Sequence, residues 1–74
     1  MKGDLTPLTA REREILAAHA RGLSRPEIAD ALFISPATVG RHIGNLREKL
    51  GIKNVHELIV YATKWAMQAG LIEG

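Results

Sequence analysis

The stretch "SRPEIADALFISPATVGRHIGNLREKL", residues 24–50, decides the fold because it contains two helix starts joined by a very short connection. Ser24 and Glu27 form a capping box, and Ser35 followed by Pro36 opens a second helix. Only "FIS" separates the two helices. A short helix, a tight turn and a longer helix are typical of a helix-turn-helix, which lays its second helix in the DNA major groove. A plain helical bundle with tight turns is the alternative.

Two further helices flank this unit. Thr9 and Glu12 form a capping box before one of them, and Asn54 and Glu57 repeat the pattern before the other. No alternating apolar run is long enough for a strand. We therefore expect an all-α fold, a compact four-helix domain containing a helix-turn-helix. The expected helices cover about residues 10–21, 25–32, 36–50 and 55–69. The expected divisions are a flexible lead-in at 1–8, the domain at 9–70 and a tail at 71–74.

Composition narrows the class of protein. A chain of 74 residues supports one core, and the absence of cysteine excludes disulfides and thiolate metal sites. The second half is the more positive: residues 1–34 carry five basic and five acidic side chains, whereas residues 35–64 carry five and two. This excess is compatible with a phosphate-rich partner or with a solvated surface.

Several functions are not expected from the sequence. No apolar run suits a signal peptide or a membrane span, so we expect a cytoplasmic protein that does not contact a membrane. The three histidines lack metal-ligand spacing, and no nucleophile-base pair or phosphate-binding loop is recognisable. We expect no enzyme activity, no metal and no cofactor.

Four blocks carry a resemblance to a known family. They are "LTAREREIL" (8–16), "GLSRPEIADALFIS" (22–35), "TVGRHIGNLREKLGI" (38–52) and "VYA" (60–62). In this order and spacing the chain resembles, over about residues 5–69, the DNA-binding domain of LuxR-type transcription regulators, also called the GerE or NarL/FixJ class. The resemblance implies a four-helix domain that binds inverted-repeat DNA as a dimer. Such domains are usually attached to a phosphoreceiver domain, as in response regulators, or to a ligand-binding domain.

The sequence departs from the family pattern at candidate DNA contacts. The family commonly has an asparagine-lysine pair where this chain has Arg25 and Pro26, and a lysine at the position of Gly40. Gly44 often corresponds to a polar or basic residue, and Val55 frequently to an arginine. The departures bear on DNA affinity and sequence specificity, whereas the core and the caps match.

The helix at 36–50 carries the main candidate contacts. With Val39, Ile43, Leu46 and Leu50 inside, Ala37, Arg41, Gly44 and Glu48 fall on the opposite side. Arg41 is expected to donate two hydrogen bonds to guanine O6 and N7. Gly40 and Gly44, each costing about 1 kcal/mol relative to alanine, are expected to allow close approach to the groove. Alternatively, Arg41 is solvated, and the glycines are tolerated or make room for another helix.

The other candidate DNA contacts are polar or basic. Thr38 and Asn45 lie on one flank of the outer face, opposite the Gly40 flank, and the helix start at Ser35 offers backbone amides to phosphate. The candidate phosphate contacts are Arg25, Arg47, Lys49 and Lys53. The alternative for each is an ordinary cap, surface residue or solvated charge.

The last helix has two apolar faces. The expected inner face comprises Leu58, Ile59, Ala62, Trp65, Ala66 and Ala69. On the other face, the resemblance implies a dimer contact formed by Val60, Thr63, Lys64 and Met67. Isolated exposed apolar residues are the alternative.

Together these observations predict a sequence-specific DNA-binding domain of a bacterial-type transcription regulator. Its expected partners are double-stranded DNA, a second copy of the chain on DNA, and RNA polymerase. One alternative is a protein-interaction module that keeps the fold without DNA recognition, suggested by Pro26, Gly40 and Val55. Another is the promoter-recognition region of a sigma-type factor, which the "LREKLGI" exit and the last helix disfavour.

Overall fold

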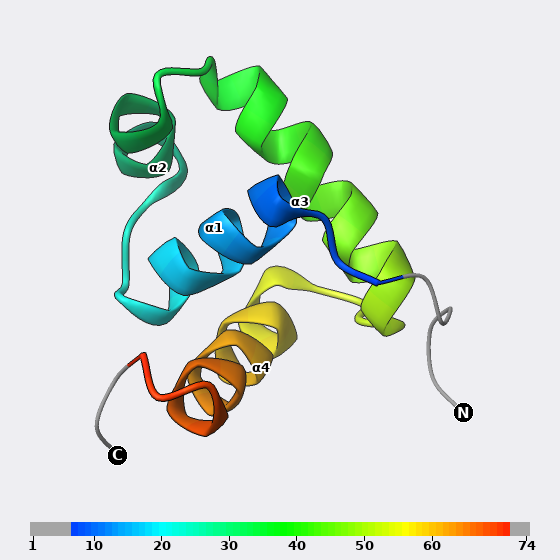
Figure 1. Cartoon of the computed structure of the whole chain (residues 1–74). Helices are drawn as coiled ribbons and strands as arrows, with labels where there is room; N and C mark the ends of the chain where they lie inside the picture. Colours follow the sequence, from blue (N-terminus) through cyan, green and yellow to red (C-terminus); the bar gives the residue numbers. More distant parts are fainter. Residues whose placement is uncertain (1–6, 72–74) are drawn as a thin grey trace.

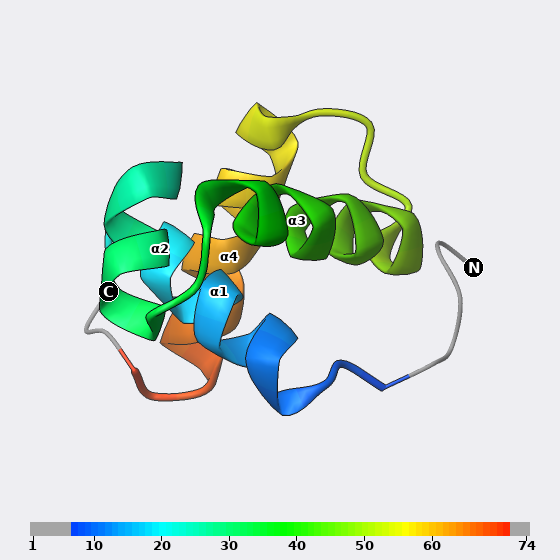
Figure 2. The ribbon, with the colours of Figure 1, turned by 90° about the horizontal axis from the view of Figure 1, so that it is seen from above.

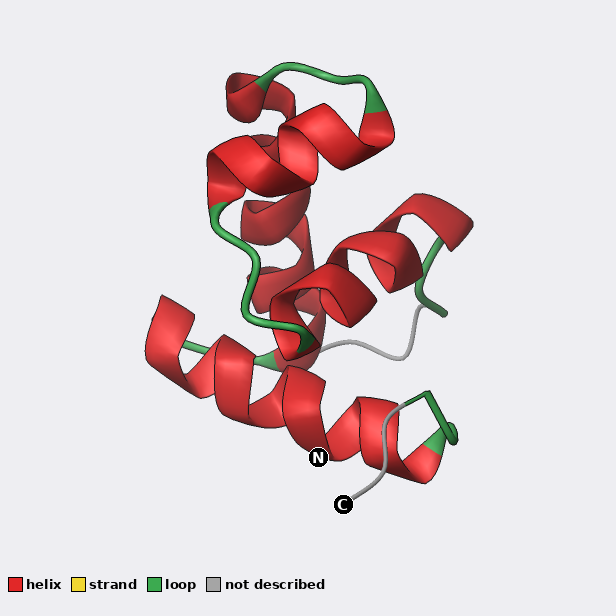
Figure 3. Ribbon diagram, turned by 90° about the vertical axis from the view of Figure 1, so that its left-hand side faces the viewer, coloured by secondary structure: helices red, strands yellow, loops and turns green. Residues whose placement is uncertain are grey.

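The computed structural model describes residues 7–71, which form four helices and no strand (Figure 1). Their bounds are α1 Ala10–Ala20, α2 Arg25–Leu32, α3 Pro36–Leu50 and α4 Val55–Gln68. The all-α prediction is confirmed, and all regular structure in this range is helical (Figure 3). Most of the predicted lead-in and tail, residues 1–6 and 72–74, lies outside the described residues. Leu8, within the described part, is half-buried and packs against the core.

A side-chain cap opens every described helix. Thr9, Ser24, Ser35 and Asn54 have extended backbones, and each side chain accepts a hydrogen bond from the backbone amide three residues later. These bonds satisfy amides that have no partner within the helix. The starts of the helices are therefore set by local sequence.

The turn between α2 and α3 has an unusual backbone. Phe33 ends α2 with φ of 58°, in the left-handed region that bulky side chains rarely adopt. Its side chain is 95% exposed, so burial of the ring does not compensate for this conformation. The next amide, of Ile34, donates to the carbonyl of Ala29 at 3.0 Å, and Ile34 packs against the core. The hydrogen bond and the packing of Ile34 therefore hold the turn in this conformation.

The core forms around α1, which contacts each of the other three helices (Figure 2). α2 packs mainly on α3, and α4 packs mainly on α1. Apolar side chains from all four helices fill the space between them. The buried apolar residues are Ile15, Leu16, Ile28, Ala29, Val39, Ile43, Leu46, Leu58, Ala62 and Ala66.

The inner face of α4 is narrower than predicted. Ile59 and Ala69, expected to face inward, are exposed, and Trp65 is half-buried. Because α4 packs mainly against one helix, only the row Leu58, Ala62 and Ala66 is fully covered. The prediction for Ile59 and Ala69 was therefore wrong.

A nearly buried ion pair joins α1 to α3. One carboxylate oxygen of Glu12 accepts from the Thr9 backbone amide at 2.8 Å and from the Lys49 ammonium at 2.7 Å. The side chains are 4% and 17% exposed, for Glu12 and Lys49 respectively. Burial raises the pKa of Glu12, but the hydrogen bonds from Lys49 and Thr9 and the charge of Lys49 outweigh burial and lower the pKa below 4.5.

We expect Glu12→Gln to lower the free energy of unfolding by about 2 kcal/mol at pH 7, because the amide keeps the cap but leaves the Lys49 ammonium without its counter-charge. Since folding lowers the pKa of Glu12, the carboxylate stabilises the fold above pH 4.5 and loses this effect as the pH falls through the folded-state pKa. Urea unfolding across this range should show the difference between wild type and variant shrinking in acid.

Glu14→Gln is the matched control. The Glu14 carboxylate is 53% exposed and lies 3.4 Å from Arg11, so its loss should change stability by less than about 0.5 kcal/mol. Equal losses for the two variants would contradict the assigned role of Glu12.

Candidate nucleic-acid interface

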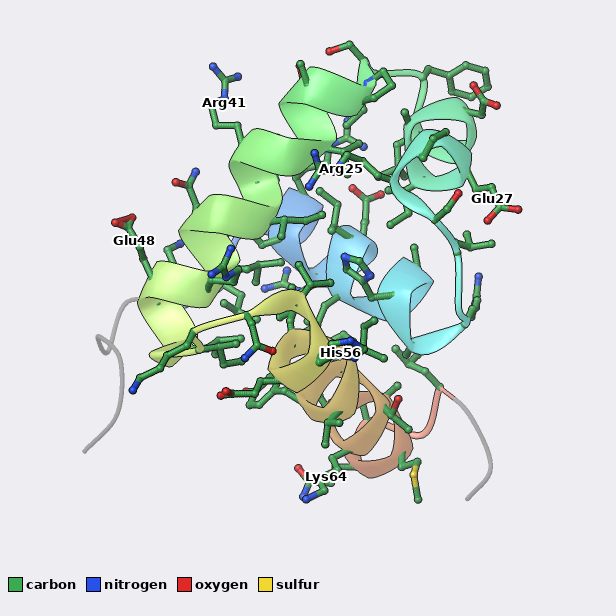
Figure 4. All side chains as sticks on the ribbon, turned by 180° about the vertical axis from the view of Figure 1, so that it is seen from behind. Arg25, Glu27, Arg41, Glu48, His56 and Lys64 are labelled. Atoms are coloured by element: carbon green, nitrogen blue, oxygen red, sulfur yellow. The ribbon has the colours of Figure 1, made fainter. Side chains whose placement is uncertain are left out.

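Arg41 projects from the outer side of α3, away from the other helices (Figure 4). The buried residues Val39, Ile43 and Leu46 fix the rotation of α3 and so the direction of Arg41. Glu48 also extends outward, nearer the C-terminal end of the helix (Figure 4). The N-terminal half of the outer face therefore carries an arginine, and the C-terminal half carries a carboxylate.

The first turn of α3 is held by two hydroxyls. The Ser35 hydroxyl accepts from the Thr38 amide at 3.1 Å, and the two side-chain oxygens lie 2.9 Å apart. Thr38 is half-buried, whereas Ser35 is exposed. The helix start thus offers its remaining amides and the positive end of its dipole toward solvent.

The two glycines of α3 have different surroundings. A Cβ atom on Gly44 would meet no atom within 4 Å, so this part of the helix surface is open. A Cβ atom on Gly40 would lie 3.1 Å from a terminal guanidinium nitrogen of Arg25. The space beside Gly40 is therefore occupied by a side chain from α2. Periodicity within α3 gave no signal for this contact.

Two of the predicted phosphate contacts take part in the fold. The Lys49 ammonium is bound to the Glu12 carboxylate, so this charge already has a partner within the domain, and its contact with phosphate stays a prediction. The Arg47 guanidinium donates to the carbonyl of Lys53, and its Nε is buried without a partner among the described residues. Arg47 thereby ties α3 to the connection that leads into α4.

The remaining polar candidates are exposed around a shallow hollow beside α3. Asn45 and Lys53 are exposed. Gly44 and Gly51, which have no side chains, also line the hollow and leave it open. The hollow is lined by Gly44, Asn45, Arg47, Glu48, Gly51, Ile52 and Lys53.

The predicted dimer face of α4 is exposed and partly apolar. Val60 is 54% and Met67 44% exposed, and Lys64 extends into solvent (Figure 4). Thr63 is half-buried, and its hydroxyl donates to the carbonyl of Ile59 at 3.0 Å. With Ile59 at 39% exposure, the apolar surface is wider than the sequence indicated.

No cluster of three or more histidine or acidic side chains suitable for a metal occurs in the range 7–71. None of its helices has the length and apolarity needed to cross a membrane. His19 is buried, and its pKa is lowered by burial and, to a smaller extent, by the charge of Arg25.

Comparison with known proteins places this arrangement in a family. Residues 6–62 match the family described as bacterial regulatory proteins, luxR family. The chain belongs to the luxR family. The match spans the capped start of α1, the helix-turn-helix and the first half of α4.

Relatives within the luxR family are regulators from distant bacteria. The transcriptional regulatory protein MctR of Rhizobium johnstonii is 50% identical over 76% of this chain and 26% of its own length. The transcriptional regulatory protein UhpA of Escherichia coli is 48% identical over 76% of this chain and 29% of its own length. The oxygen regulatory protein NreC of Staphylococcus aureus is 46% identical over 77% of this chain and 26% of its own length. The chain thus spans less than a third of each relative.

Gly44→Ala should stabilise the free domain by up to about 1 kcal/mol, because alanine favours the helix and its Cβ meets open space. If DNA approaches α3 closely at Gly44, the variant should nevertheless bind specific DNA more weakly. Urea unfolding and titration with labelled duplex measure the two effects.

Gly22→Ala is the control for the stability measurement. Gly22 has φ of 82°, so alanine there should destabilise the domain by about 1 kcal/mol, although its Cβ also meets open space. Unchanged or tighter DNA binding by Gly44→Ala would mean that Gly44 is only tolerated.

Proposed function

We propose that this domain binds DNA sequence-specifically for a transcription regulator, with α3 in the major groove. One observation carries the proposal: Arg41 extends freely from the outer face of the second helix of a helix-turn-helix. Its planar fork matches the two acceptors on the major-groove edge of guanine. Family membership and the regulators among the relatives support this function.

Phosphate contacts would orient the domain on the duplex. The amides at the start of α3, with the exposed Lys53 beyond its end, bracket the outer face on which Arg41 lies. Phosphate contacts at both ends would fix the register without reading sequence, leaving discrimination to Arg41, with Asn45 as a further candidate.

We infer that two copies pair on DNA through α4. The exposed stripe of Ile59, Val60 and Met67, with Lys64 beside it, is apolar enough for a small contact. A contact of this size suits a pair assembled on DNA better than a stable dimer in solution. We also propose that the protein acts on the chromosome in the cytoplasm and that it contacts RNA polymerase.

Arg41→Ala should weaken binding at the preferred site by roughly 1 to 3 kcal/mol and weaken binding to random duplex much less, because a bidentate guanine contact carries discrimination. Sites selected from a random duplex pool would supply the specific probe, and fluorescence anisotropy would measure both affinities. Wild-type protein should bind random duplex with a clear salt dependence.

Arg41→Lys is the matched variant, since it keeps the charge and removes the fork. It should retain binding to random duplex while losing preference for the selected site. Equal loss on both duplexes for Arg41→Ala would reduce Arg41 to a phosphate contact. Absence of salt-sensitive binding by the wild type would favour the protein-interaction alternative.

Met67→Glu should reduce cooperative occupation of a duplex with two half-sites, because it places like charges against each other across the proposed α4 contact. Binding to a single half-site should stay within about twofold of wild type. The free domain should be monomeric at micromolar concentration by sedimentation. A tight dimer without DNA would contradict the proposed mode of assembly.

Gln68→Glu adds the same charge about a quarter turn away on α4 and is the control. It should preserve more of the cooperativity than Met67→Glu. Equal effects of the two variants would point to net charge instead of the apolar stripe.

A further inference from the structure

The side chain of Arg25 covers Gly40. Arg25 is the first residue of α2, yet its guanidinium reaches across to α3. The position of a Gly40 Cβ lies 3.1 Å from a terminal nitrogen, 3.4 Å from the central carbon and 3.8 Å from the Nε of that guanidinium. All three distances are those of a flat group lying against the helix. Glycine leaves the space that this group fills.

The guanidinium remains accessible in this position. Arg25 is exposed, and Figure 4 shows it beside α3 between the two helices of the helix-turn-helix. No carboxylate of the described residues forms an ion pair with it. Its charge lowers the pKa of nearby buried His19, after the larger effect of burial. Arg25 therefore brings an uncompensated positive charge to one flank of α3.

We propose, as an extension of the proposed function, that Arg25 of α2 supplies the phosphate contact on the Gly40 flank of α3 and that Gly40 is required to hold its guanidinium there. The flank lies next to Arg41 in sequence and on the helix surface. When α3 enters the major groove, the sides of the helix face the phosphates of the groove walls. The contact is made by a residue outside α3, but its position is set by α3.

The test is a double-mutant cycle at positions 25 and 40, using random duplex over a range of salt concentrations. Arg25→Ala should weaken binding about three- to tenfold and reduce the salt slope by about one ion per monomer. Gly40→Met fills the space with a good helix former and displaces the guanidinium, so it should cause a similar loss. In the Arg25→Ala background, Gly40→Met should cost less than about twofold, since there is no guanidinium left to displace.

Arg21→Ala is the control, because Arg21 is an exposed arginine in the turn between α1 and α2. It should leave the salt slope unchanged. Circular dichroism at the assay temperature establishes that each variant is folded. An equal loss from Gly40→Met in both backgrounds would overturn the proposal, because Gly40 would then provide clearance for the DNA itself.

The outcomes separate this inference from the proposed function. Salt-sensitive binding by the wild type with an unchanged slope in Arg25→Ala would overturn the role of Arg25 alone. A loss confined to selected sites would overturn it as well, by making Arg25 a base contact. If the wild type binds no duplex at any salt concentration, both proposals fail.

Discussion

The carboxylate of Glu12 is the constraint on which the rest of the structure depends. It holds the first amide of the α1 cap and the ammonium of Lys49 at the same time, so it joins the start of α1 to the last turn of α3. Apolar packing between these helices is non-directional, whereas an ion pair with a hydrogen bond has defined geometry. The rotation of α3, and hence the outward direction of Arg41, follows from this pair together with the buried row of α3.

The positive charge of α3 is divided between folding and the candidate interface. Lys49 and Arg47 are used within the domain, the first by Glu12 and the second by a carbonyl of the following connection. The exposed cations near the outer face are then Arg41, Lys53 and Arg25. With few exposed cations near it, the outer face depends on the placement of each one, because every phosphate contact releases about one counterion and contributes to affinity in that proportion.

Local features of the fold were predictable and long-range ones were not. The caps at Thr9, Ser24, Ser35 and Asn54 depend on residues three apart, and the direction of Arg41 depends on periodicity within one helix. The ion pair between Lys49 and Glu12 joins residues 37 apart in sequence, so it could not be predicted from the spacing of residues within a helix. The position of the Arg25 guanidinium beside Gly40 likewise depends on how α2 and α3 pack against each other, so it could not be predicted from the pattern within one helix.

The exposure of Ile59 was missed for a related reason. A helical wheel indicates which side chains share a face, but the width of the buried part depends on how many helices cover that face. α4 is covered mainly by α1, so the apolar row beside Leu58 and Ala62 stays in solvent. The proposed pairing surface is therefore a product of packing as well as of sequence.

Phe33 has a consequence for how this domain tolerates change. A bulky residue in the left-handed region costs about 1 to 2 kcal/mol, and its 95% exposed ring recovers none of this through burial. Glycine or asparagine would adopt the same backbone with less strain. Replacing Phe33 by glycine or asparagine would therefore stabilise the domain. Evolution or a protein engineer could use this added stability to offset destabilising changes on the outer face of α3 that alter DNA specificity.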